Sequence, residues 1–136
     1  ALPQPLRARV PRLVSPPSMA PDPDDMPFAR ICDNLDEGLA DADVVMALRI
    51  QRERISDLEG IPGTDEYFSS FGVSHERMKI ARPDAIVMHP GPMNRGIEIE
   101  GSLADGGQSV ITEQVTNGVA VRMAVLERVA GTLEKQ

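Results

Sequence analysis

The chain has 136 residues, 41% of them hydrophobic, which suits one globular domain with a modest core. Its formal net charge of -7 and its scarcity of aromatic residues argue against general nucleic-acid binding, which needs a basic face and stacking rings. Cys32 is the only cysteine, which excludes an intrachain disulfide and a cysteine-based metal cluster, and no apolar run approaches the length that spans a bilayer.

Residues 1–9 contain two prolines and no strand or helix period, so we expect irregular chain or part of a truncated helix there. Four later segments have the composition of strands: 9–15, 28–32, 42–48 and 84–88. Three segments have the pattern of helices: 34–41, 74–81 and 109–130. Asp33 or Asn34 can cap the first helix and Ser74 the second. Strands that alternate with helices predict a single α/β domain with a mainly parallel sheet.

The segments between these elements are predicted to be loops. Prolines dominate residues 16–27, residues 97–107 are rich in glycine, and residues 55–73 carry several glycines with few apolar anchors. Because long loops in compact domains are often functional, we expect residues 55–73 to be a mobile, functional loop. Gly118 is unfavourable inside the last helix and suggests that this helix packs closely against another element. Without a signal-peptide pattern at its N-terminus, the protein is assigned to the cytoplasm by default.

The segment 84–88 runs directly into His89-Pro90-Gly91-Pro92, a turn at the carboxyl end of a strand, where open α/β sheets bind their ligands. Two prolines remove two N–H donors and leave carbonyl groups dominant, while Gly91 lets a ligand approach the backbone. The turn therefore suits a substrate NH2 group, although a plain loop after a buried strand has the same pattern. His89 is either a general acid or base or, as we favour, a structural hydrogen-bonding group.

Arg49 follows the segment 42–48, and parallel strands would place it at the same edge of the sheet as His89. Its guanidinium could bind a carboxylate or a phosphate, or it could be a solvated member of the charged run that ends at Arg54. Gln51 is close enough in sequence to reach the same pocket, and Arg95 has the same two interpretations as Arg49. The two histidines do not have the spacing of metal ligands, and no nucleotide-binding glycine motif is present.

Three blocks of sequence resemble, in order and spacing, the aspartate-binding half of bacterial aspartate carbamoyltransferase, in the aspartate/ornithine carbamoyltransferase family. The blocks are Asp43–Arg54, Val87–Gly96 and Gln114–Leu126. The resemblance covers nearly the whole chain from about residue 10. It implies a three-layer αβα, Rossmann-like fold that is incomplete at its N-terminal side. An ornithine carbamoyltransferase would be expected to carry a cysteine within residues 89–92, where this chain has none.

The resemblance also implies an activity, which is transfer of the carbamoyl group of carbamoyl phosphate to L-aspartate in de novo pyrimidine biosynthesis, giving N-carbamoyl-L-aspartate and phosphate. Arg49 would bind an aspartate carboxylate with help from Gln51, and residues 55–73 would close over the substrate. The carbamoyl amino group would meet the carbonyl groups of three residues: Pro90, Gly91 and Pro92. Supporting roles would fall to His89, Arg54 and Arg95. The family uses no metal or organic cofactor and assembles as homotrimers.

Two parts of the family's sequence are missing from these residues. One is the carbamoyl-phosphate domain with its Ser-Thr-Arg-Thr phosphate loop. The other is the Gly-Asp…His-Ser-Arg segment, which supplies the first strand of the sheet and a second arginine for aspartate. We therefore expect little turnover without the missing half. Two alternatives stay open: a catalytically inactive fragment or interaction module of the same fold, and a related carbamoyltransferase with another amino-acid acceptor.

Overall fold

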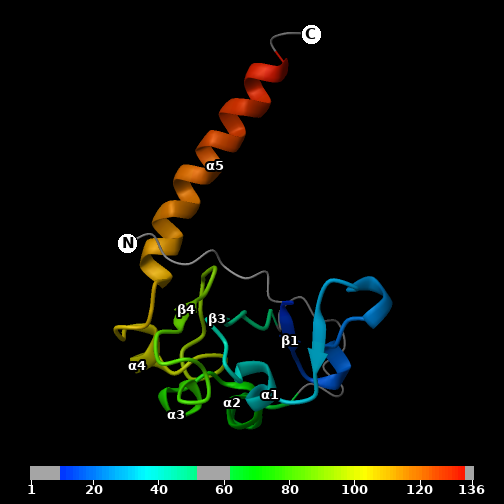
Figure 1. The fold of residues 1–136 in the computed structure, drawn as a ribbon. Coiled ribbons are helices and arrows are strands. Elements are labelled where there is room, and N and C mark those ends of the chain that lie inside the picture. Colours follow the sequence, from blue (N-terminus) through cyan, green and yellow to red (C-terminus); the bar gives the residue numbers. More distant parts are fainter. Residues whose placement is uncertain (1–9, 52–61, 134–136) are drawn as a thin grey trace.

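The computed structural model describes residues 10–51 and 62–133 of the chain (Figure 1). It contains four short strands: β1 (Arg12–Val14), β2 (Arg30–Cys32), β3 (Val44–Met46) and β4 (Ile86–Met88). β1 pairs with β2 and β3 pairs with β4, both in parallel, with Leu13 opposite Ile31 and Val45 opposite Val87. The prediction of an α/β fold with parallel strands is thus confirmed, but the described strands form two separate two-stranded sheets.

The first crossover, between β1 and β2, consists of two 3₁₀ turns, η1 (Pro17–Met19) and η2 (Pro23–Asp25). Proline begins each turn, where its missing N–H costs no hydrogen bond. The Asp22 side chain caps η2 by accepting a hydrogen bond of 2.9 Å from the N–H of Asp24. The prolines and aspartates of the predicted loop 16–27 therefore form two defined 3₁₀ turns.

Two helices begin at the caps that the sequence predicts. The Asn34 side chain accepts a hydrogen bond from the Glu37 N–H at 2.9 Å and begins α1 (Leu35–Leu39). Ser74 accepts from the Arg77 N–H at 3.3 Å and begins α3 (His75–Met78). α1 buries Leu35 and Leu39 and α3 buries Met78, so each cap fixes the start of a helix that contributes to the core.

Two predicted loops contain short helices instead. α2 (Thr64–Phe71) lies in the segment predicted as a mobile loop, and α4 (Gly101–Ala104) lies in the predicted irregular segment 97–107. α2 buries Tyr67, and the Arg77 guanidinium donates to the carbonyl groups of Ser69 and Gly72 at its C-terminal end, at 2.5 and 2.8 Å. Residues 55–61, the beginning of the predicted loop, lie outside the described residues.

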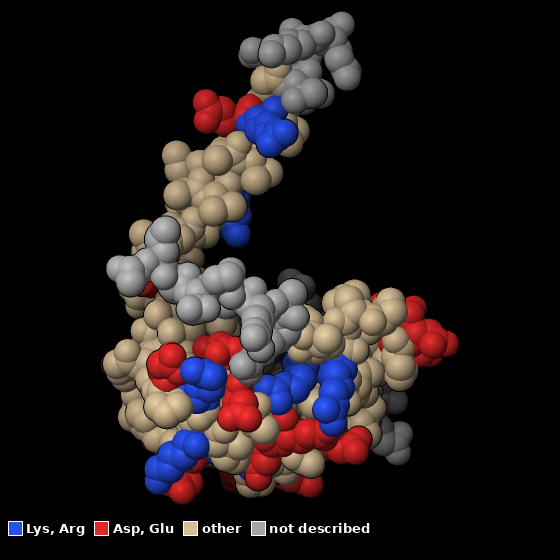
Figure 2. All heavy atoms as spheres, in the orientation of Figure 1, with Lys and Arg blue, Asp and Glu red and all other residues tan. Residues whose placement is uncertain are grey.

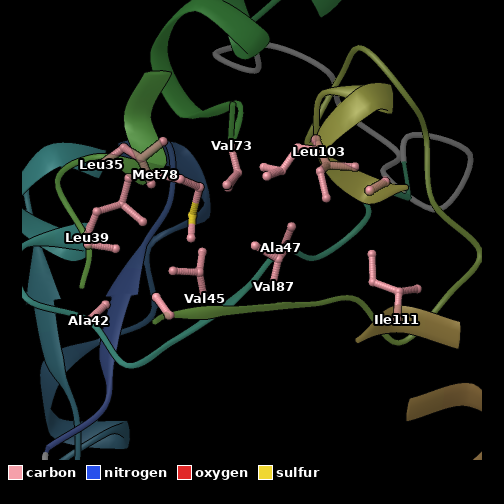
Figure 3. Packing of buried hydrophobic residues seen from close by; sticks show 14 residues of the cluster. Leu35, Leu39, Ala42, Val45, Ala47, Val73, Met78, Val87, Leu103 and Ile111 are labelled. Atoms are coloured by element: carbon pink, nitrogen blue, oxygen red, sulfur yellow. The ribbon is translucent and has the colours of Figure 1, made fainter. Parts of the chain in front are cut away.

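The core lies where β3 and β4 meet the short helices (Figure 3). Val45 and Ala47 point into it beside Val87, and side chains of the covering segments, including Leu103, close it from the other side. The apolar run 42–48 predicts a buried strand, and this is wrong for one face. Three of its apolar side chains are 46–60% exposed, because no described residue covers them: Val44, Met46 and Leu48.

α5 (Ile111–Leu133) is the longest helix, as predicted, and it projects away from the body of the protein (Figure 1). Within residues 111–131 only Ile111 is buried, and apolar side chains farther along the helix, such as Val119 and Leu126, are exposed. The face of α5 that is visible in the space-filling view is largely uncharged (Figure 2). No described atom comes within 4 Å of a Cβ built on Gly118, so the expected close packing there is not observed. No helix in the described part of the chain is long and apolar enough to cross a membrane.

Candidate functional site

The candidate site lies at the edge of the sheet where β3 and β4 end. Met46 is opposite Met88 in the parallel pair. Arg49 and Gly91 each follow their strand by three residues (49 − 46 and 91 − 88), so they leave the sheet at the same edge. The parallel pairing of the two strands therefore brings the predicted cation and the predicted turn to one side of the molecule.

The turn itself presents its backbone to solvent. Pro90, Gly91 and Pro92 are all exposed, the Gly91–Pro92 peptide bond is cis, and Gly91 has a φ of 68°. No backbone N–H of the described residues donates to the carbonyl groups of these three residues. The turn can therefore offer open acceptors to a ligand that carries N–H groups.

His89 is fully buried behind this turn and is held from three sides. Its backbone N–H donates to Oε1 of Gln114 at 3.0 Å, and its ring nitrogen Nδ1 accepts from the backbone N–H of Gly91 at 2.9 Å. Because Nδ1 is an acceptor, the ring hydrogen of the neutral imidazole lies on Nε2, which is 3.2 Å from Oε1 of Glu98. This geometry favours the structural role for His89 over that of a general acid or base.

Glu98 is the residue of the site that sequence reasoning missed. It is 2% exposed, and its Oε1 accepts hydrogen bonds from Nε2 of His89 and from the N–H of Asn94. One carboxylate oxygen thus connects His89, at the beginning of the loop after β4, to Asn94, five residues later. The only local signal was a glutamate between two isoleucines, Ile97 and Ile99, in a segment interpreted as irregular.

Arg95 forms part of the loop rather than of the open turn. Its guanidinium forms a bidentate ion pair with the Asp105 carboxylate, with Nη1–Oδ2 and Nη2–Oδ1 distances of 2.6 and 2.9 Å. Nη1 also donates a hydrogen bond to the Gly101 carbonyl at 2.9 Å. The hydrogen bond to Arg95 lowers the pKa of Asp105, and the same bond raises the pKa of Arg95. Arg95 therefore anchors the loop to α4.

The remaining predicted residues differ in what the structure says of them. Arg49 is half-buried and Gln51 is exposed, while Arg54 lies outside the described residues. Within residues 10–51 and 62–133, no three His, Cys, Asp or Glu side chains come together in a way that could hold a metal ion. What this part of the chain brings together is a set of backbone acceptors and a cationic side chain, an arrangement suited to a ligand with both N–H groups and an anionic group.

Comparisons with known proteins show which proteins the chain is similar to. Residues 10–129 match the model of the aspartate/ornithine carbamoyltransferase family, Asp/Orn binding domain. The structure is similar to that of ornithine carbamoyltransferase from Burkholderia thailandensis, with 29% identity and a TM-score of 0.66 over 85% of this chain. It is also similar to aspartate transcarbamoylase from Trypanosoma cruzi, solved with carbamoyl phosphate and aspartate, with 25% identity and a TM-score of 0.68 over 85% of this chain.

This chain spans less than half the length of these solved proteins. It covers 37% of the Burkholderia thailandensis chain and 39% of the Trypanosoma cruzi chain. The ornithine carbamoyltransferase from Campylobacter jejuni, at 22% identity, has the same fold with a TM-score of 0.70, and 44% of its length is covered. Aspartate and ornithine enzymes are therefore both similar to this chain. Each of them contains a large part that has no counterpart in the given sequence.

Proposed function

The chain belongs to the aspartate/ornithine carbamoyltransferase family, and we propose that it is the acceptor-binding part of an enzyme that carbamoylates L-aspartate. The observation that carries this proposal is the exposed turn of Pro90, Gly91 and Pro92, held from behind by the buried His89–Glu98 pair. Its open carbonyl groups would accept hydrogen bonds from the carbamoyl NH2 group. Carbamoyl phosphate itself would be held mainly by the part of the enzyme that these residues do not include.

In the proposed reaction the amine of L-aspartate attacks the carbamoyl carbon. A C–N bond forms, the C–O bond to phosphate breaks, the amine loses a proton and phosphate leaves. The residues of this chain contribute by positioning, because carbonyl groups that fix the carbamoyl NH2 orient its carbon toward the amine. No step in this scheme requires a nucleophilic side chain or a proton transfer from His89, whose two ring nitrogens are already engaged.

Aspartate is the proposed acceptor because of the charge at the edge of the sheet. Arg49 leaves β3 at the edge where Gly91 leaves β4, and a guanidinium binds a carboxylate through two parallel hydrogen bonds. L-Aspartate has a side-chain carboxylate for this purpose, whereas the side chain of L-ornithine ends in a cation that Arg49 would repel. We assign Gln51 a secondary part in the same binding, and Arg54 stays a prediction.

The test measures acceptor choice. The chain is assayed for carbamoyl transfer to L-aspartate and to L-ornithine, alone and together with a separately expressed carbamoyl-phosphate domain. Binding of each amino acid to the chain is followed by NMR at the backbone amides of Arg49 and Gly91. We expect carbamoyl-aspartate to form only when the second domain is present. We expect L-aspartate, but not L-ornithine, to change the chemical shifts of these two amides.

Two results would contradict the proposal in different ways. Carbamoyl-ornithine as the product would show that the acceptor is wrong and that this is a related carbamoyltransferase. Absence of both products from a mixture in which the two parts demonstrably associate would favour a non-catalytic interaction module of the same fold.

A further inference from the structure

The edge of β4 that faces away from β3 pairs with the residues just before α5. Val87 forms a parallel bridge with Ser109, and its N–H donates to the Gln108 carbonyl at 2.8 Å. The Val110 N–H donates in turn to the Val87 carbonyl at 3.0 Å. Because every second residue of a strand bonds to the same neighbour, the next bond of this parallel ladder would run from the His89 N–H to the Val110 carbonyl.

α5 interrupts the ladder at His89, just before the exposed turn of residues 90–92 (the carbonyl turn). The helix begins at Ile111, and its Gln114 N–H donates to the Val110 carbonyl at 2.8 Å. The acceptor that the ladder would offer to His89 is therefore in use inside the helix. Since His89 is fully buried, its N–H needs an acceptor of another kind.

Gln114 supplies this acceptor with its side chain. Its Oε1 accepts from the backbone N–H of His89 at 3.0 Å, so the residue that occupies the Val110 carbonyl also replaces it. On the other side of the same peptide group, the Met88 carbonyl accepts from the Ala47 N–H at 3.0 Å. The last peptide group of β4 is thus held between the end of β3 and the first turns of α5.

This peptide group determines how the carbonyl turn leaves the sheet. The Met88–His89 peptide is planar, and the ring of Pro90 restricts the φ of the next residue, so little backbone freedom separates them. The Nδ1 of His89 also accepts from the Gly91 N–H at 2.9 Å. A shift of the His89 backbone would therefore be passed on to the carbonyl groups of residues 90–92.

We propose that Gln114 is a positioning residue for the carbonyl turn, because its side-chain oxygen fixes the His89 backbone and thereby directs the open carbonyl groups toward the carbamoyl NH2 group. Gln114 acts through His89, and no contact of its own with the substrate is required. What the turn binds rests on the proposed function, whereas the effect of Gln114 on the shape of the turn does not. The two parts can therefore be tested separately.

The first experiment follows the turn in the full 136-residue chain by NMR. Gln114→Met keeps the length of the side chain but leaves only a weak sulfur acceptor, and Gln114→Glu keeps an oxygen acceptor. Gln114→Met should speed amide hydrogen exchange at His89 by at least about tenfold and move the Gly91 amide signal, while Gln114→Glu should restore both. The matched control is Glu113→Met, an exposed neighbour in the same helical turn, which should change neither.

The second experiment separates positioning from general support of the fold. Carbamoyl transfer to L-aspartate is measured with each variant combined with a separately expressed carbamoyl-phosphate domain. In Gln114→Met the KM for carbamoyl phosphate should rise by about tenfold, because its NH2 group meets misdirected acceptors, while the KM for L-aspartate should stay within about twofold. Loss of folded protein would instead lower kcat and leave both KM values unchanged. Gln114→Glu and Glu113→Met should resemble the original chain.

Three results would overturn the proposal. One is unchanged exchange at His89 in Gln114→Met, and another is an equal effect of Glu113→Met. The third is faster exchange at His89 with an unchanged KM for carbamoyl phosphate, since the bond would then support only the fold. If the original chain and the second domain gave no carbamoyl-aspartate, the proposed function would fail instead. The Gly91 signal would then decide alone, because an unmoved signal in Gln114→Met overturns the positioning role and a moved signal upholds it.

Discussion

His89 Nε2 lies 3.2 Å from Oε1 of Glu98, and both side chains are almost completely removed from solvent. The same oxygen accepts from the Asn94 N–H, and the other ring nitrogen of His89 accepts from the Gly91 N–H. These bonds place a buried polar cluster directly behind the exposed turn. The shape of the turn therefore depends on one carboxylate.

Glu98→Ala should reduce the free energy of unfolding by about 2–4 kcal/mol, because it leaves the buried His89 Nε2–H and the Asn94 N–H without an acceptor. Equilibrium denaturation in urea measures the effect. Glu98→Gln retains a carbonyl oxygen and should cost less. If both variants were as stable as the original chain, the cluster would have no part in holding the fold.

Tyr67 allows the burial of α2 to be tested by titration. Burial raises the pKa of Tyr67 above its ordinary value of 10.0, and the negative charge of Glu98 raises it further. Tyr67 is the only tyrosine and the chain has no tryptophan, so its ionisation can be followed directly by ultraviolet absorbance. We expect the transition at a higher pH in the native chain than in urea, and a partial return toward 10 in Glu98→Gln.

The same shift predicts how stability depends on pH in alkali. Because the folded-state pKa of Tyr67 is raised, its contribution is fully present below pH 10 and is lost as the pH rises through the folded pKa. Tyr67→Phe should remove this part of the pH dependence, as measured by urea unfolding at several pH values. An unchanged alkaline profile in Tyr67→Phe would contradict the assignment.

Elements with local signals could be predicted from the sequence. Asn34 and Ser74 cap their helices through side-chain bonds that span three residues, so the signal and its effect are neighbours in the chain. α2 and α4 were missed because distant groups complete them. Arg77 donates to carbonyl groups at the end of α2, and the Glu100 side chain at the start of α4 accepts from the His75 N–H at 3.0 Å. Such contacts are not visible in a local pattern.

The candidate site was predictable to a similar extent. Parallel strands were enough to place Arg49 and the turn at Pro90–Pro92 on one edge of the sheet. Glu98 could not be found this way, because its importance comes from a hydrogen bond across nine residues to a histidine whose tautomer is set by the backbone. The uncovered face of β3 was also unpredictable, since an apolar run does not indicate whether anything covers both of its faces.

Gly96→Ala tests the backbone of the loop. Gly96 has a φ of 80°, and no atom lies within 4 Å of a Cβ built there, so the cost comes from the backbone alone. We expect the free energy of unfolding to fall by about 1–2 kcal/mol. Gly107→Ala is the control, because that glycine also has open space but no positive φ, and it should be neutral or slightly stabilising. Equal effects would mean that strain is not the cause.

Arg49→Ala tests the proposed acceptor site in the chain combined with a carbamoyl-phosphate domain. Loss of one charge-assisted fork should weaken L-aspartate binding by about 100-fold, while affinity for carbamoyl phosphate should change far less. The matched control is Arg82→Ala. The Nε atom of Arg82 lies 3.2 Å from Oδ1 of Asp43 and 3.3 Å from Oδ1 of Asp84. Because these two aspartates come just before β3 and β4 begin, Arg82 lies at the opposite edge of the sheet. Calorimetric titration with each substrate separates the two outcomes. A similar loss in both variants would point to general destabilisation, and unchanged aspartate affinity in Arg49→Ala would refute the role proposed for this residue.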